Sequence, residues 1–237
     1  MNIYAYWEGD NRHWYYDLCW STVKLWNPEA VLLTRRDVED TIGRIPTELD
    51  QVYVIHRVDW IRKKWIATIG GVWVDMDFIC WSPLTQLATV AELFDFIGYK
   101  EWHGTGWMDN VFAARKGSVI LLDAAEYALQ QVQQYGSRVQ WLAASAYAMN
   151  HALERHKWGY WLQMPTHLIS PVSVMDRDWF ATVEETFDPF CFSSFGQITS
   201  FHVIGDWIKG RFHTPDELLQ SGTRLGALFA RALRASR

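Results

Sequence analysis

The sequence predicts an α/β fold in which helices flank a mainly parallel sheet, within a single domain spanning residues 1–237. Short apolar or alternating segments, typical of strands, alternate along the chain with longer segments whose apolar residues have helical spacing. A length of 237 residues is enough for one sizeable α/β domain and short for two. No internal repeat, low-complexity tract or linker divides the chain.

The expected elements follow from these two patterns. Strands are predicted at Asn2–Trp7, Ala30–Thr34, Val72–Asp75, Phe94–Tyr99, Val111–Ala114, Trp158–Gln163 and Ile198–Ile204. Helices are predicted at His13–Trp26, Val52–Ile69, Ser118–Tyr135, Val139–His156 and Asp176–Glu185, with a C-terminal amphipathic helix over about residues 215–235. Two polar, glycine-containing segments are expected to be loops, Arg35–Glu48 (with one helical turn) and Lys100–Asn110.

The composition is that of a globular protein with many tryptophans. Hydrophobic residues make up 49% of the chain and charged residues 21%, which excludes an intrinsically disordered protein. The chain has 15 tryptophans, whose flat rings fill cores and also stack on sugars and nucleobases. A formal net charge of −5 gives no general attraction to nucleic acids or acidic membranes.

The cysteines and the N-terminal residues predict a cytoplasmic, soluble protein. Cys19, Cys80 and Cys191 are widely spaced and form no C-x-x-C pair, so neither a disulfide framework nor a zinc site is expected. The first residues lack the basic and apolar regions of a signal peptide, and no apolar run approaches the length of a membrane span. We therefore expect no integral membrane span.

Two carboxylates follow the strand predicted at Val72–Asp75. Asp75 and Asp77 are two residues apart, and in an extended backbone such side chains point the same way. Oxygen ligands of this kind suit hard divalent cations such as Mg²⁺ or Mn²⁺, which keep open positions for phosphate oxygens. A lone D-x-D is common in solvated turns, but a D-x-D after a helix, Gly70-Gly71 and an apolar strand is much rarer.

The helix before this strand begins with an acid and a base three residues apart. Arg62 is placed to pair with Asp59 or to bind phosphate with two hydrogen bonds. The simpler interpretation is an exposed i,i+3 pair that contributes only a few tenths of a kcal/mol, about 0.2–0.5 kcal/mol.

These motifs, in this order, resemble a family of glycosyltransferases with a D-x-D sugar-nucleotide motif. The family includes yeast-type initiating mannosyltransferases and bacterial capsule and lipopolysaccharide enzymes, and it is distantly similar to the glucosylating domain of large clostridial toxins. The matching residues are Trp7-Glu8-Gly9, Trp20, Asn27-Pro28, Asp59-Trp60-Ile61-Arg62 and Gly70-Gly71-Val72-Trp73-Val74-Asp75-Met76-Asp77. The resemblance covers about the first half of the chain.

The resemblance implies a GT-A fold, a Rossmann-like domain that binds a nucleotide sugar. It implies that Trp7 stacks on the nucleobase and that Asp59 and Arg62 contact the nucleotide sugar. Asp75 and Asp77 would hold Mn²⁺ (or Mg²⁺) and the ribose. The implied activity is metal-dependent, retaining transfer of a hexose from a nucleotide sugar, a UDP-hexose, to an acceptor hydroxyl on a glycan, a protein or a modified DNA base.

Later segments match the family less closely. Asp109 and Asn110 fit a loop that leads into a strand beside the donor sugar. His202 fits the histidine that completes the metal site, and Trp207 and Lys209 would contact the diphosphate. The family pattern H-x-x-G-x-x-K-P-W is not fully met, because Lys209 comes one place late and the proline is absent.

Two other interpretations of the function stay open from the sequence. One is a catalytically silent module that binds nucleotides or glycans. Another is a metal-dependent phosphohydrolase of the haloacid-dehalogenase type, which places its D-x-D on the first strand and follows it with Thr or Val, whereas Ile79 stands at that place here. The basic C-terminal helix favours a packed, solvated chain end over a surface for membranes or nucleic acid. The sequence does not fix the oligomeric state.

Overall fold

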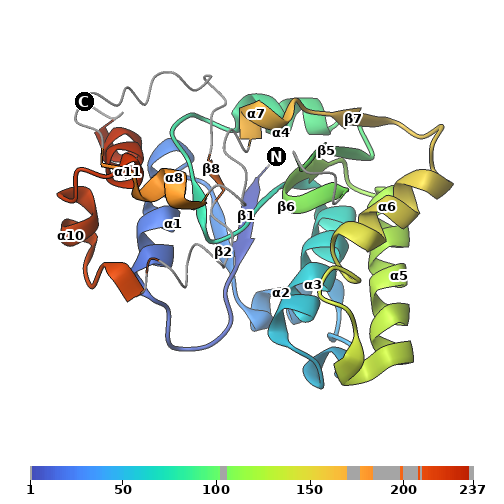
Figure 1. Ribbon diagram of the computed structural model, residues 1–237. Coiled ribbons are helices and arrows are strands. Elements are labelled where there is room, and N and C mark those ends of the chain that lie inside the picture. Colours follow the sequence, from blue (N-terminus) through green and yellow to red (C-terminus); the bar gives the residue numbers. More distant parts are fainter. Residues whose placement is uncertain are drawn as a thin grey trace. The chain divides into compact units, whose positions relative to one another are not determined.

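A computed structural model describes residues 2–101, 106–169, 177–183, 198–199, 208 and 210–234 (Figure 1). The chain forms two compact units, and each unit is assembled from three segments that alternate along the sequence. Unit 1 comprises Met1–Glu8, Val31–Val74 and Thr85–Met164, and unit 2 comprises Gly9–Ala30, Asp75–Leu84 and Pro165–Arg237. No single linker separates the two units, and the expectation of one domain over residues 1–237 stays a prediction.

Unit 1 is an α/β structure. Its strands are β1 (Ile3–Tyr6), β2 (Val31–Leu33), β3 (Gly71–Val74), β5 (Phe96–Lys100), β6 (Trp107–Ala114) and β7 (Trp161–Gln163). Its α-helices are α2 (Arg35–Ile42), α3 (Val54–Ile69), α4 (Thr85–Ala91), α5 (Val119–Tyr135) and α6 (Ala146–Arg155), with short 3₁₀ helices at Thr47–Asp50 and Gly136–Arg138. The predicted α/β class is therefore confirmed.

The strands of unit 1 form one mixed sheet in the order β2-β1-β3-β6-β5-β7. β1 is parallel to both β2 and β3, and β5 is parallel to β7. β6 runs antiparallel to both of its neighbours, β3 and β5. The sheet is therefore parallel at three of its five pairings and less uniform than the mainly parallel sheet that the sequence predicts.

Helices cover both faces of this sheet. Trp73 of β3 and Phe112 of β6 share a core with side chains of α3, α5 and α6, which lie together on one side of the sheet in Figure 1. Val72 and Val74 point to the opposite face because side chains alternate along a strand. α4 contacts β3 and β6, and its buried residues Leu87, Ala88 and Ala91 belong to that second layer.

The Gly70-Gly71 pair brings α3 directly into β3. A Cβ atom on Gly71 would lie 2.5 Å from the backbone oxygen of Asn2, and one on Gly70 would lie 2.8 Å from the backbone nitrogen of Lys116. Both residues also have a positive φ, 81° for Gly70 and 123° for Gly71. Only glycine permits this close approach of β3 to its neighbours.

Unit 2 is mainly helical. It contains α1 (Trp14–Trp26), β4 (Phe78–Ile79), α7 (Thr166–Ile169), α8 (Arg177–Ala181), β8 (Ile198–Thr199), α10 (Pro215–Leu219) and α11 (Arg224–Arg234), and β4 pairs antiparallel with β8. Tyr15 of α1 packs against Phe229 of α11 with ring centroids 5.9 Å apart. α11 buries Leu225, Leu228 and Phe229, so its apolar face is packed, as the sequence favours.

Three of the predicted helices are wrong in extent, and one of them, expected at Asp176–Glu185, is the shorter α8, which ends at Ala181. The C-terminal helix expected over 215–235 is two helices, because Gly222 has a φ of 67° and the Thr223 hydroxyl accepts the N–H of Gly226 in the first turn of α11. The helix expected at Val139–His156 begins only at Ala146. The carbonyl oxygen of Ala144 instead accepts a hydrogen bond from the Lys63 ammonium at 2.8 Å.

Two predicted loops also contain regular structure. Within Arg35–Glu48, α2 extends over eight residues, and Thr34 and Asp37 cap it by bonding each other's backbone N–H. Within Lys100–Asn110, β6 already begins at Trp107. Within the described ranges, no helix is long and apolar enough to cross a bilayer.

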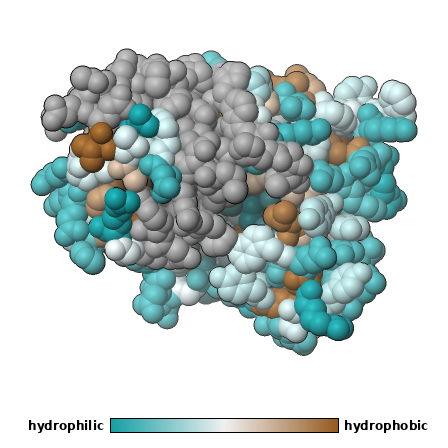
Figure 2. Space-filling view, viewed as in Figure 1, coloured by the Kyte–Doolittle hydropathy of each residue, from teal (hydrophilic) through white to brown (hydrophobic). Residues whose placement is uncertain are grey.

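The surface view shows the described residues from one side. Hydrophilic side chains predominate on this face, and hydrophobic ones form small separate patches (Figure 2). Among the large hydrophobic residues that the structure describes, Trp158 is the most exposed, at 90%.

Candidate functional site

Several of the predicted site residues of unit 1 come from one edge of its sheet. β1 and β3 are parallel, so their carboxyl ends lie at the same edge. Trp7 follows β1 directly, and its backbone N–H extends the ladder by donating to the oxygen of Leu33 at 3.1 Å. β6 enters from this edge, and its Val111 pairs with Val74, the last residue of β3. Asp109 and Asn110 precede Val111 and therefore lie at the same edge as Trp7.

A charged cluster holds the loop that carries Trp7. Glu8 accepts a hydrogen bond from the Tyr6 hydroxyl at 3.0 Å and pairs with the Arg57 guanidinium at 2.9 Å. Arg57 also donates to Asp50 at 3.0 Å, and Arg35 pairs with the same Asp50 at 2.8 Å. Burial, together with the adjacent Glu8 carboxylate, raises the pKa of the Tyr6 hydroxyl, which therefore stays protonated and can donate. We call Glu8, Arg35, Asp50 and Arg57 the outer ionic cluster.

A second ionic cluster is fully buried behind the sheet edge. The guanidinium of Arg62 pairs with the Asp59 carboxylate at 2.7 Å and donates to the backbone oxygen of Asp109 at 2.8 Å. The ammonium group of Lys63 pairs with the Asp109 carboxylate and donates to the backbone oxygens of Asp59 at 3.0 Å and Ala144 at 2.8 Å. We call Asp59, Arg62, Lys63 and Asp109 the inner ionic cluster.

The inner cluster is balanced in charge, with two carboxylates and two cations. The side chains of Asp59 and Arg62 are only 2% and 3% exposed, so the alternative of an exposed i,i+3 pair is wrong. Buried charges need partners and hydrogen bonds, and here α3 supplies three of the four charges to fix the fourth, on β6. The cluster therefore locks the beginning of β6, where Asp109 lies, onto α3.

Lys63, which pairs with the candidate site residue Asp109, is the member of the inner ionic cluster that the sequence analysis missed. Its side chain is fully buried, whereas a lysine within a basic run on a helix is ordinarily solvated. Its position four residues after Asp59 was the available signal, because such a spacing places the two residues on one helix face. The next residue of β6, Asn110, is also fixed, since its side-chain oxygen accepts from the Tyr99 hydroxyl at 2.8 Å.

In unit 2, the D-x-D lies in a turn. β3 ends at Val74, and the backbone N–H of Phe78 donates to the oxygen of Asp75 at 3.1 Å, which closes a turn over the two acids. The expectation that the strand includes Asp75 and that an extended backbone aligns the two carboxylates is therefore wrong. Asp75 and Asp77 are half-buried, whereas Met76 between them is 7% exposed.

The segment after the D-x-D is held by the end of α1. The amide oxygen of Asn27 accepts the N–H of Leu84 at 2.8 Å, and the Thr22 hydroxyl accepts the N–H of Cys80 at 2.9 Å. The Asn27 amide also donates to the Cys80 sulfur at 3.4 Å, and burial raises the pKa of the Cys80 thiol to about 12. Cys80 is thus a neutral packing residue, and Asn27 has a clear structural role beside the acidic turn.

The remaining predicted residues, His202, Trp207 and Lys209, lie outside the described residues, so their roles stay predictions. Among the residues that the structure describes, no group of three or more His, Cys, Asp or Glu side chains is placed to hold a metal ion. The carboxylates of Asp75 and Asp77 are therefore the two described members of the predicted metal site.

No family model and no curated protein sequence matches the chain. Solved structures that it resembles are glycosyltransferases. The PaToxG glycosyltransferase matches with a TM-score of 0.46 and 15% identity over 65% of this chain and 68% of its own. The galactosyltransferase LgtC, in complex with donor and acceptor sugar analogues, matches with a TM-score of 0.45 and 11% identity over 70% of this chain and 74% of its own.

The glycosyltransferase GlyE of Streptococcus pneumoniae TIGR4, in its apo form, matches with a TM-score of 0.44 and 11% identity, over 70% of this chain and 45% of its own. All these matches have low identity and a TM-score below one half. The likeness therefore carries no argument about activity or site residues, which rest on the motifs and contacts described above.

Proposed function

We propose that this protein is a glycosyltransferase that moves a hexose from a nucleotide sugar, a UDP-hexose, to an acceptor hydroxyl with retention of configuration. The observation that carries the proposal is the inner ionic cluster. In it, Arg62 of the D-x-x-R motif pairs with Asp59 and donates to the backbone oxygen of Asp109, a residue of β6 that lies beside the carboxyl end of β3. The next residue along the chain after β3 is the first acid of the D-x-D, Asp75. The order of motifs in the sequence and the contacts in unit 1 therefore point to the same residues.

The chain offers a set of contacts for the sugar donor. Trp7 is half-buried, and its loop is fixed by Glu8, so the indole is a preorganised platform for the uracil ring. Asp109 and Asn110 lie at the same sheet edge and are proposed to orient the hexose. Because Asp59 and Arg62 are buried, we propose that they act on the donor by holding Asp109 in place. The direct contact with the nucleotide sugar that the family resemblance implies stays a prediction.

The D-x-D fits a hard divalent cation in its chemistry. Asp75 and Asp77 provide half-buried carboxylate oxygens, the ligands that Mg²⁺ and Mn²⁺ prefer. We propose that these two residues hold the ion together with His202. When bound, the ion supplies charge stabilisation for the departing diphosphate. Trp207 and Lys209 are proposed to add contacts to the diphosphate, and the cytoplasm expected from the sequence is the proposed place of action.

A silent nucleotide- or glycan-binding module is the main alternative, and a phosphohydrolase is the second. One assay distinguishes the proposed transferase from both alternatives. Of the three, only a transferase releases UDP and free hexose from a UDP-hexose and leaves simple phosphate esters intact. The acceptor does not have to be known, because a transferase without its acceptor commonly passes the hexose slowly to water.

The experiment measures donor hydrolysis and thermal stabilisation over a panel of UDP- and GDP-hexoses, with Mn²⁺ and with chelator. We expect one UDP-hexose to be hydrolysed and to raise the melting temperature, and both effects to disappear with chelator and in Asp77→Ala. The matched control is Asp40→Ala, which removes a carboxylate that is 71% exposed on α2. Wild-type hydrolysis by Asp77→Ala, or release of phosphate without hexose, would contradict the proposal.

A further inference from the structure

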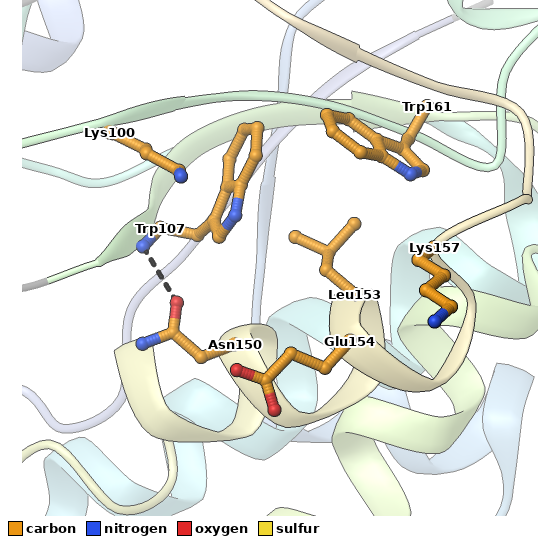
Figure 3. Close-up of a pocket in the computed structure, with 7 residues that line it drawn as sticks. All are labelled: Lys100, Trp107, Asn150, Leu153, Glu154, Lys157 and Trp161. Carbon is orange, nitrogen blue, oxygen red and sulfur yellow. Dashed lines mark hydrogen bonds between the residues drawn. The ribbon is translucent and has the colours of Figure 1, made fainter.

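Unit 1 contains a pocket that the proposed donor site does not use. Its volume is ≈ 450 Å³, and it is lined by Lys100, Trp107, Asn150, Leu153, Glu154, Lys157 and Trp161 (Figure 3). Pockets of about 300–1,000 Å³ are typical of sites for small molecules. The lining comes from the end of β5, the beginning of β6, the last turns of α6 and the beginning of β7.

Two indole rings form the apolar wall of this pocket. The rings of Trp107 and Trp161 meet nearly at right angles, with centroids 5.3 Å apart and an interplanar angle of 83°. Trp107 is 5% exposed and is held by Phe96 behind it, with ring centroids 5.6 Å apart, whereas Trp161 is half-buried. Trp107 is thus a fixed part of the pocket wall, and the more exposed Trp161 ring can contact a ligand.

Polar groups gather opposite the indole wall. Asn150, Glu154 and Lys157, from α6 and the turn after it, contribute polar groups to the lining; Figure 3 shows Leu153 pointing toward the two rings, with Asn150 and the Glu154 carboxylate on one side of it and Lys157 on the other. The Asn150 side-chain oxygen accepts the backbone N–H of Trp107 at 3.1 Å, which orients the amide so that its nitrogen can donate elsewhere. Glu154 forms neither an ion pair nor a side-chain hydrogen bond within the part of the chain that the structure describes.

Two exposed aromatic residues lie in the short segment between two lining residues of the pocket. Trp158 is 90% exposed and Tyr160 is 69% exposed, and both lie between Lys157 and Trp161, which line the pocket. The Lys157 ammonium lies 5.7 Å from the centroid of the Trp158 ring. Two large aromatic side chains exposed this close together in sequence are typical of a surface that contacts a partner.

We propose that this pocket binds one pyranose unit of a carbohydrate chain and that Trp158 and Tyr160 contact the next unit along. A pyranose has an apolar C–H face, which suits the Trp161 ring, and hydroxyl groups at its edge, which suit the Glu154 carboxylate, the Lys157 ammonium and the Asn150 amide. Asp109 lies two residues beyond Trp107 on β6, so the pocket opens from the strand that carries the proposed sugar contacts. If the proposed function holds, the bound chain is the acceptor glycan.

The test is calorimetric titration of the full chain with defined trisaccharides, two neutral (maltotriose and cellotriose) and one acidic (trigalacturonic acid). We expect at least one of them to bind, and Trp161→Ala to weaken that binding at least about tenfold, as expected for an aromatic anchor in a pocket. Glu154→Ala should weaken it less. The matched control is Trp141→Ala, which removes a tryptophan of unit 1 that is 45% exposed and does not line the pocket.

Three results would overturn this inference. They are no binding by any of the trisaccharides, equal binding by Trp161→Ala and the wild type, and a loss in Trp141→Ala as large as that in Trp161→Ala. Binding of uridine monophosphate, in place of a trisaccharide, that is lost in Trp161→Ala would assign the pocket to nucleotides. Hydrolysis of the UDP-hexose tests the proposed function separately, because Trp161→Ala should bind the saccharide poorly and still hydrolyse the donor.

Discussion

The two ionic clusters of unit 1 both include residues of α3, three in the inner cluster and only Arg57 in the outer one, and they differ in their contact with water. In the inner cluster the side chains of Asp59, Arg62, Lys63 and Asp109 are between 0% and 5% exposed. In the outer cluster the side chains of Glu8, Arg35, Asp50 and Arg57 are between 11% and 36% exposed. The first cluster fixes Asp109, and the second fixes the loop of Trp7, so each positions one side of the proposed donor site.

The difference in exposure predicts a difference in tolerance. A charge that loses its partner in the inner cluster stays away from water, so the cost of desolvation is not recovered. A charge that loses its partner in the outer cluster turns toward solvent, which replaces most of the interaction. Both clusters should matter for sugar transfer, but only the inner one should be indispensable for the fold of unit 1.

The largest effect is expected from Lys63→Met. The substitution keeps the length of the side chain and leaves the Asp109 carboxylate with only Arg62 as a cationic partner, which should lower the free energy of unfolding by about 3–5 kcal/mol. Urea denaturation followed by circular dichroism measures it.

The double variant Lys63→Met/Asp109→Leu tests whether the effect belongs to the pair. Removing both charges should recover part of the lost stability, because no unpaired buried charge remains. Additive losses in the double variant would show that the two residues contribute independently.

A smaller effect is expected from Arg57→Ala. Arg57 is 11% exposed and bonds Glu8, Asp50 and the backbone oxygen of Leu49, so its loss should cost about 1–3 kcal/mol. It should also free the loop of Trp7 and raise the KM for the UDP-hexose more than it lowers kcat. Arg36→Ala, at an arginine that is 89% exposed, is the matched control and should change neither quantity.

The smallest effect is expected from Asp50→Asn, and it depends on pH. Hydrogen bonds from Arg35 hold the pKa of the Asp50 carboxyl below its ordinary value. The ionised form therefore stabilises the folded chain above about pH 4, and this contribution is lost as the pH falls through the lower folded-state pKa. Asp50→Asn should be less stable than the wild type by under about 1 kcal/mol near neutral pH. Urea denaturation should show this difference shrinking toward about pH 3; a constant difference would contradict the assignment.

Much of unit 1 can be predicted from the sequence because its signals are local. Helical spacing and the Gly70-Gly71 pair locate α3 and β3 to within one or two residues, and in unit 2 Asn27-Pro28 correctly predicts the end of α1. Some of the wrongly predicted elements depend on distant partners, whereas the missed α2 has a local signal in its Thr34–Asp37 capping box. α6 starts late where the Ala144 carbonyl accepts from Lys63, a residue of another helix.

The candidate site also has a part that the sequence predicts and a part that depends on tertiary packing. The types of Asp59, Arg62 and Asp109 and their order in the chain suggested a common site, and the structure joins these three residues directly. The spacing from Asp59 places Lys63 on the same helix face, but its burial follows from how α3, β6 and the segment before α6 pack together, which the sequence does not show. The turn at Asp75–Phe78 was also missed, since the short β4 that follows it pairs with a strand distant in sequence, β8.

The alternation of the two units along the chain has a consequence for biosynthesis. α1 leaves the ribosome well before α11, yet the side chains that bury its Tyr15 include Phe229 of α11. The apolar face of α1 therefore lacks this partner until α11 has been translated. We expect nascent chains of this protein to depend on a chaperone that shields α1 until α11 emerges.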